Sequence, residues 1–337
     1  MGQCYFSGSN SGDGFYNSFD GIVPSWGKLT RYFMIKGGPG VGKSTLMKRV
    51  TAKAEEAGEE VELFYCSGDP DSLDGVRLVN KGIVFADATA PHVMDPKLPG
   101  AVEEIVNLGE QIDRKRISRH RENIEMLMGK NKESYERGYG FLRAAKALEA
   151  VRYREICNCV NREKLKRQAE DMGEKFGSNG KQESRQLFLD ALSCKGRVSF
   201  AKEPCEGNQV YRVLGAEKDV ITDLLAKLLP GREKEFFCSP LCPERVTHML
   251  LRETEFYLTS GAGTDGTLLL ASDYLEKNCH ILTGRYADLT RQLEDEAMGC
   301  FKECKRIHDE LEDIYRECAD FSAITERTER LLELLRE

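Results

Sequence analysis

A lysine and a serine that follow a run of glycines have the types and spacing that phosphate chemistry needs. The run KGGPGVGKST matches the pattern G-x-x-x-x-G-K-[ST]. Glycines let the backbone wrap a phosphate with its N–H groups, and a helix that begins near the lysine adds its positive dipole end. Lys43 would reach the β- and γ-phosphates, and Ser44 would hold Mg²⁺. The residues expected to bind nucleotide are Gly38, Pro39, Gly40, Val41, Gly42, Lys43, Ser44 and Thr45.

Such a loop works only between a strand and a helix, and the flanking sequence predicts both. The apolar run from Tyr32 to Ile35 indicates a strand, and the stretch after the loop is helical until near Gly58, a typical residue just past a helix end. Residues 61–66 (VELFYC) predict a second strand. The alternative is a glycine-rich turn that binds nothing.

Carboxylates follow two of the predicted strands. Residues 83–87 (IVFAD) form an apolar run that ends in Asp87, which is the form expected for a residue that orients Mg²⁺ beside the loop serine. Asp69 is its rival, because it also follows a strand directly. A carboxylate between Asp69 and Asp74 would orient the attacking water. His92 has the chemistry to sense a γ-phosphate or move a proton, but a single histidine in a loop is more often structural.

Length and composition bound the classes of protein to consider. The chain has 337 residues, which favours two domains, and 40% hydrophobic with 31% charged residues is ordinary for a globular protein. A net charge of -7 argues against extensive nucleic-acid binding. No stretch approaches 18 consecutive apolar residues, and the first residues lack the pattern of a secretory signal, so we expect a cytoplasmic protein without membrane contact.

Twelve cysteines in a long chain of this kind are expected to be reduced thiols that pack in the interior. Two groups have spacings that would suit a metal: Cys238 and Cys242 with His248, and Cys300, Cys304 and His308. Neither group supplies four ligands by itself, and cysteine on the inner face of a helix is the commoner case.

Two helical arms of opposite charge are predicted. Residues from about 101 to 176 read as a pair of long helices packed as a hairpin, with a break among Gly129, Gly138 and Gly140. Residues 113–167 hold 16 Lys and Arg against 8 Asp and Glu, whereas residues 286–337 hold 8 against 15. A basic arm would suit nucleic acid or an acidic partner, but the two arms would also suit each other, which disfavours nucleic acid.

The second half of the chain repeats the first in weakened form. After a polar linker at 177–184, Leu187-Phe188 corresponds to Tyr5-Phe6, residues 210–215 to the strand before the glycine run, and residues 219–229 to the helix after it. The shared order predicts an internal duplication. The segment GAEKDVI that begins at Gly215 lacks GK[ST], so we expect the second copy not to bind nucleotide.

The motifs SGSNSGDGFYNSFD, KGGPGVGKSTLMKRV, FYCSGDPDSLDGV and FADATAPH together resemble a little-characterised family of bacterial P-loop ATPases with two tandem NTPase-like halves. The resemblance covers most of residues 3–110 and, more faintly, the second half. In such ATPases both halves can carry a phosphate loop, and this chain departs from that pattern. The resemblance implies ATP binding and hydrolysis, but it supplies no physiological substrate.

These expectations combine into one hypothesis. The fold would be α/β of the P-loop NTPase type, three layers around a mostly parallel sheet, internally duplicated and with long helical arms. The domains would be 1–176, with an arm at about 101–176, and a degenerate 185–337, with an arm at about 268–337.

The function would be Mg²⁺-dependent ATP hydrolysis with an unknown protein or small-molecule partner. Lys43, Asp87 and Asp69 would be catalytic, with Mg²⁺ on Ser44 and Asp87. The second half would pack on or regulate the first, and Arg212, Lys218 or Arg245 would approach the γ-phosphate. A small-molecule or nucleotide kinase, and a nucleotide-binding regulatory module with little turnover, remain alternatives.

Overall fold

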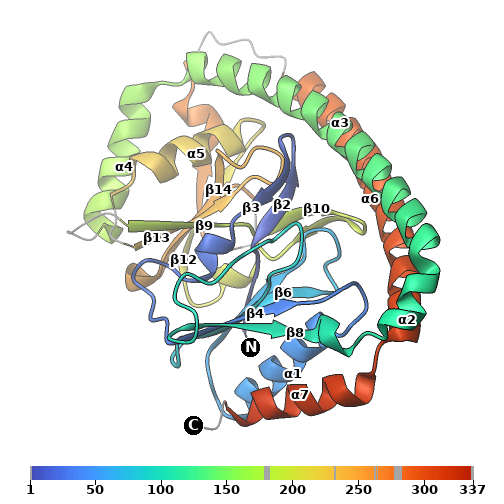
Figure 1. Ribbon diagram of the computed structural model, residues 1–337. Helices are drawn as coiled ribbons and strands as arrows, with labels where there is room; N and C mark the ends of the chain where they lie inside the picture. The colour runs from blue at the N-terminus through green and yellow to red at the C-terminus, as the bar shows by residue number, and fades with distance from the viewer. Residues whose placement is uncertain are drawn as a thin grey trace.

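Two six-stranded sheets flanked by helices make up the chain, as the computed structural model shows for residues 2–177, 183–230, 233–261, 263, 265–276 and 283–334 (Figure 1). This confirms the predicted α/β class. In the ranges just given, no helix combines the length and the apolar composition that crossing a membrane requires. The predicted linker at 177–184 lies for the most part outside the described residues.

The first sheet is mixed, where a mostly parallel sheet was expected. Its order is β1-β5-β6-β7-β4-β8, with bounds β1 Gln3–Phe6, β4 Arg31–Lys36, β5 Val61–Tyr65, β6 Leu73–Leu78, β7 Ile83–Asp87 and β8 Glu103–Asn107. β6 runs antiparallel to both neighbours, and the other pairings are parallel. Strand β6 was not predicted, because Asp74, Gly75 and Arg77 give this segment the composition of a polar loop. In the structure all of its residues are buried.

The second sheet repeats this arrangement strand for strand. Read from the opposite end, its order is β9-β13-β14-β15-β12-β16, and β14 again runs antiparallel to both neighbours. The remaining pairings are again parallel. The bounds are β9 Glu183–Leu187, β12 Gln209–Leu214, β13 Glu233–Cys238, β14 Val246–Leu251, β15 Phe256–Thr259 and β16 Thr267–Leu270.

Two small hairpins join the halves. One is β2 Gly8–Ser11 with β3 Gly14–Asn17, and the other is β10 Asp190–Ser193 with β11 Gly196–Ser199. Each reaches the opposite half: Gly12 N donates to Leu241 O at 3.2 Å, and Cys194 N donates to Gly68 O at 3.2 Å. Between the two hairpins, Phe6 and Phe188 exchange both backbone hydrogen bonds. These contacts relate the halves by an approximate two-fold symmetry.

One α-helix follows the corresponding strand of each sheet. α1 Lys43–Glu56 follows β4, and α5 Lys218–Leu228 follows β12. The short helices are α2 Arg114–Ile117, η1 Phe19–Ile22, η2 Leu108–Gln111, η3 Ser118–His120, η4 Glu203–Cys205, η5 Arg252–Thr254 and η6 Ala271–Tyr274. β8 and η2 occupy the beginning of the segment that was expected to be helical throughout.

The long helices α3 Arg121–Cys159 and α6 Thr283–Cys318 lie side by side along one flank of the molecule (Figure 1). The expected helical hairpin within residues 101–176 does not form, because α3 continues through all three glycines. At Gly138 an added Cβ would lie 2.8 Å from the ring of Phe301 on α6, so this glycine permits close helix contact. The basic and acidic segments do pack on each other.

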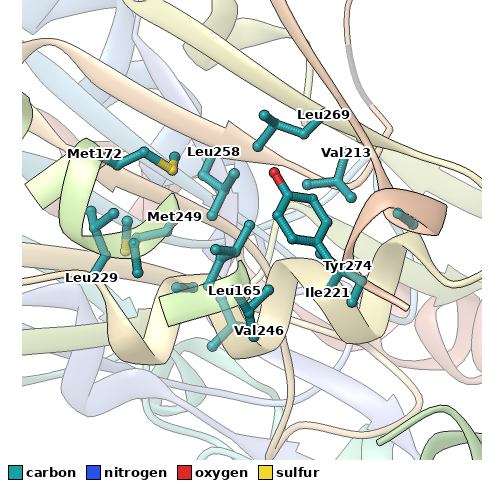
Figure 2. Packing of buried hydrophobic residues seen from close by; sticks show 14 of the residues in the cluster. Leu165, Met172, Val213, Ile221, Leu229, Val246, Met249, Leu258, Leu269 and Tyr274 are labelled. Carbon is teal, nitrogen blue, oxygen red and sulfur yellow. The ribbon is translucent and has the colours of Figure 1, made fainter. Parts of the chain in front are cut away.

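The helix that follows each long helix packs on the sheet of the other half. α4 Arg162–Phe176 belongs to the first half, yet Leu165 and Met172 pack in the core of the second sheet, as Figure 2 shows. α7 Phe321–Glu333 belongs to the second half and packs Leu331 into the core of the first sheet. Each core is therefore completed by a helix from the other half.

Candidate functional site

The glycine run forms a loop of six residues between β4 and α1. Gly40 and Gly42 have φ angles of 68° and 92°, a region that side chains with a Cβ rarely adopt. Val41 between them is fully buried and anchors the loop in the core. α1 begins at Lys43 directly after the loop, so its unpaired N–H groups are at the loop. This is the geometry that a phosphate group requires.

Lys43 and Asp87 are brought together from two different elements. β7 lies next to β4 and parallel to it, with Ile35 opposite Asp87, so both strands end at the same edge. Lys43 Nζ lies 3.7 Å from Asp87 Oδ2 and donates to Gly37 O and Gly38 O at 2.9 and 3.0 Å. Burial raises the pKa of Asp87, against the opposing charge of Lys43.

Ser44 faces the start of β6, whereas Thr45 faces solvent. The Ser44 hydroxyl accepts a hydrogen bond from Leu73 N at 3.0 Å. Because a hydroxyl oxygen has two lone pairs, one remains for a metal ion. Thr45, the last residue of the predicted binding set, is exposed.

Asp69 and Asp71 are held by lysines from the second half. Asp69 Oδ2 lies 3.1 Å from Lys305 Nζ on α6, and Asp71 pairs with Lys195 at the tip of the β10–β11 hairpin. Asp71 is largely exposed. The structure therefore places these two carboxylates in contacts between the halves, and Asp87, not Asp69, lies beside Lys43.

A further carboxylate, Asp74, lies beside Asp87 at the same end of the sheet. Gly75 pairs with Ala86, which brings Asp74 to the strand position beside Asp87. Asp74 is buried, and its Oδ2 lies 3.3 Å from Nε2 of His92, which is buried as well. From the sequence, Asp74 was one member of an acidic segment and His92 a single histidine in a loop. No local pattern shows that the two side chains meet.

Helices α6 and α7 of the second half cover the loop. An added Cβ at Gly38 would lie 2.6 Å from the ring of Tyr315, and one at Gly40 would lie 2.8 Å from Glu312 O. Gly42 approaches Ile324 of α7 in the same way, at 3.8 Å. These contacts join positions more than 270 residues apart, so local sequence patterns could not have shown them.

The cations that were expected to approach from the second half make other contacts. Arg245 pairs with Glu149 at 3.1 Å and stacks on Tyr153, and Lys218 lies beside Gly261. Arg212 lies within β12. Lys305 of α6 is instead a cation that the second half brings to the Asp69 segment.

The two cysteine and histidine groups do not form metal sites. In the described part of the chain, no three side chains of His, Cys, Asp or Glu gather as an all-protein site would need. His248 contacts Asp190 and Thr259 at 3.1 and 2.7 Å, and His308 contacts Glu312. A magnesium site with nucleotide differs, because Mg²⁺ takes one or two protein oxygens together with phosphate and water. Ser44 and Asp87 suit such a site.

Comparison with family models, with curated proteins and with solved structures found no match for this chain.

Proposed function

We propose that the chain is a Mg²⁺-dependent P-loop ATPase of the cytoplasm, with its single nucleotide site in the first half. The observation that carries the proposal is the convergence of Lys43 and Asp87, 3.7 Å apart, at the end of two adjacent parallel strands. A glycine-rich turn without function gives no reason for a partly buried carboxylate at the end of the adjacent strand. Phosphoryl transfer requires both groups.

Each residue has a role that follows from its position. Backbone N–H groups of the loop and the start of α1 bind the phosphates, and Lys43 stabilises the charge that develops on the transferred group. Mg²⁺, held by Ser44 and Asp87, would neutralise the β- and γ-phosphates. The contacts of Lys43 with Gly37 O and Gly38 O keep its ammonium group inside the loop.

The second half belongs to the proposal as a pseudo-domain that binds no nucleotide. The matching strand order of the two sheets supports an internal duplication as its origin. Its role is to cover the first site, which α6 and α7 do through Tyr315, Glu312 and Ile324. A helix that packs on the phosphate loop responds to any change of the loop, so nucleotide turnover would move α6.

The test is phosphate release from Mg²⁺-ATP by the purified full chain, compared with a Lys48→Ala control. Lys48 lies on α1 about one turn beyond Lys43. It is exposed and donates to Asp71 O, so its loss should leave turnover unchanged. Release that needs Mg²⁺ and no acceptor supports the ATPase. Turnover only with an added metabolite would indicate a kinase instead. Tight binding with negligible turnover would indicate a regulatory module, and absence of nucleotide binding would overturn the proposal.

A further inference from the structure

The proposed site does not yet include a carboxylate that acts on the attacking water. Asp74 is the second residue of the antiparallel strand β6, and the backbone N–H of the first, Leu73, donates to the hydroxyl of Ser44. Asp74 is therefore next in the chain to the residue that contacts Ser44, and the register of β6 with β7 brings it beside Asp87.

The rival carboxylates of the segment are neutralised by cations. Asp69 is tied to Lys305, and Asp71 to Lys195. Each of these carboxylates is therefore already engaged by an ammonium group of the second half. Asp74 has a histidine as its partner instead, and it is also more buried than either rival.

His92 is fixed with respect to both Asp74 and Asp87. Its backbone N donates to Thr89 O at 2.7 Å, and Thr89 N donates to Asp87 Oδ1 at 2.8 Å. The ring stacks on Phe19, with centroids 4.4 Å apart, and meets the edge of Phe15. With Nε2 toward Asp74, the buried Nδ1 has no hydrogen-bond partner. Nδ1 can therefore accept a hydrogen bond from a water molecule while Nε2 faces Asp74.

We propose that Asp74 is the carboxylate that orients and deprotonates the attacking water, and that His92 is the positioning residue that holds it. The inference rests on the proposed ATP hydrolysis. The water oxygen forms a bond to the γ-phosphorus, and the bond from phosphorus to the bridging oxygen breaks, with its electron pair leaving on ADP. The water proton goes to Asp74. Contact of His92 with Oδ2 leaves Oδ1 of Asp74 to accept from water.

The experiment compares Asp74→Asn with Asp71→Asn in the full chain, measuring phosphate release and the Kd for Mg²⁺-ATP. Loss of a general base costs about 100-fold or more in rate. Asp74→Asn should therefore lower kcat about 100-fold or more while Kd changes less than about threefold. Asp71→Asn is the control, because its carboxylate is exposed, and it should keep kcat within about twofold. Equal rates in the two variants would overturn the inference.

A second pair of variants tests the positioning role, and it also covers the case in which Asp74→Asn does not fold. Gln can place its amide nitrogen near the position of Nε2, whereas Phe keeps the ring packing and loses the donor. His92→Phe should lower kcat about tenfold at unchanged Kd, and His92→Gln should restore much of it. Equal loss in both would show a merely structural histidine and would overturn this part.

The Lys43→Ala variant distinguishes failure of the proposed ATPase function from failure of the proposed role of Asp74. If it abolishes turnover while Asp74→Asn does not affect it, the ATPase stands and the role of Asp74 fails. If Lys43→Ala leaves turnover unchanged, the proposed function itself fails.

Discussion

The two connections from strand to helix are the most instructive comparison in this molecule. Six residues, Gly37 to Gly42, join β4 to α1, whereas three residues, Gly215 to Glu217, join β12 to α5. The following helix begins with lysine in both cases, Lys43 and Lys218. Both halves therefore have a strand, a turn and a helix in the same order, and the turn of the second half is the shorter one.

What surrounds each lysine differs accordingly. Lys43 faces loop carbonyls and Asp87. Lys218 Nζ instead packs against Gly261, 2.6 Å from the position that an added Cβ there would take. The short loop is closed by Arg152 of α3, which donates to Ala216 O at 2.9 Å. Each connection is thus covered by a long helix from the other half.

The largest expected effect separates the two lysines. Lys43→Ala should lower kcat for ATP hydrolysis at least about 100-fold, because it removes a cation from the transferring phosphoryl group. Lys218→Ala should leave the rate unchanged, because we expect its shorter loop, which lacks GK[ST], not to bind a phosphate. Phosphate release under saturating Mg²⁺-ATP measures both, and thermal unfolding checks the fold. A loss of turnover in Lys218→Ala would show that the halves are not functionally distinct.

The second expected effect ranks the two carboxylates that follow strands. Asp87→Asn should reduce Mg²⁺-dependent turnover about 100-fold, because the amide is a weak ligand for a hard cation. Asp69→Asn should cost far less, since it breaks only the contact with Lys305. Titration of Mg²⁺ against phosphate release measures the ranking. The reverse order would assign Mg²⁺ to Asp69.

Local patterns predicted the parts of the site that lie within one strand–loop–helix unit. β4 and β7 are apolar runs, and the bounds of β7 match the prediction at both ends. β6 was missed because its burial comes from pairing on both sides, which overrides the polar character of Asp74 and Arg77. The cover by Tyr315 depends on the exchange of helices between the halves. No local pattern records such a contact, because it is fixed only when the whole chain folds.

A smaller effect is expected from glycines at equivalent turns. Gly40→Ala and Gly215→Ala both force a Cβ into a positive φ region, 68° and 121°, and each should lower the free energy of unfolding by about 1–3 kcal/mol. Only Gly40→Ala should also weaken nucleotide binding, because its loop is the one proposed to wrap the phosphate and its Cβ would meet Glu312 O. Denaturant unfolding and nucleotide titration distinguish the two. Equal loss of affinity would mean that the second turn also contributes to the site.

The smallest expected effect is a shift of the acid limb of activity with Mg²⁺ concentration. Burial raises the pKa of Asp87, so protonation begins at a higher pH than for an exposed aspartate. Only the ionised carboxylate binds Mg²⁺, so activity falls as the pH decreases through that pKa. More Mg²⁺ should move the half-maximal pH downward, by up to about one unit per tenfold increase in Mg²⁺, because metal and proton compete for one site.

Rate measurements between pH 4 and 8 at two Mg²⁺ concentrations, ~0.5 and ~5 mM, would show this shift. The control variant Lys48→Ala is expected to behave like the unaltered chain. An acid limb that does not respond to Mg²⁺ would separate the titrating group from the metal and would remove Asp87 from the proposed site.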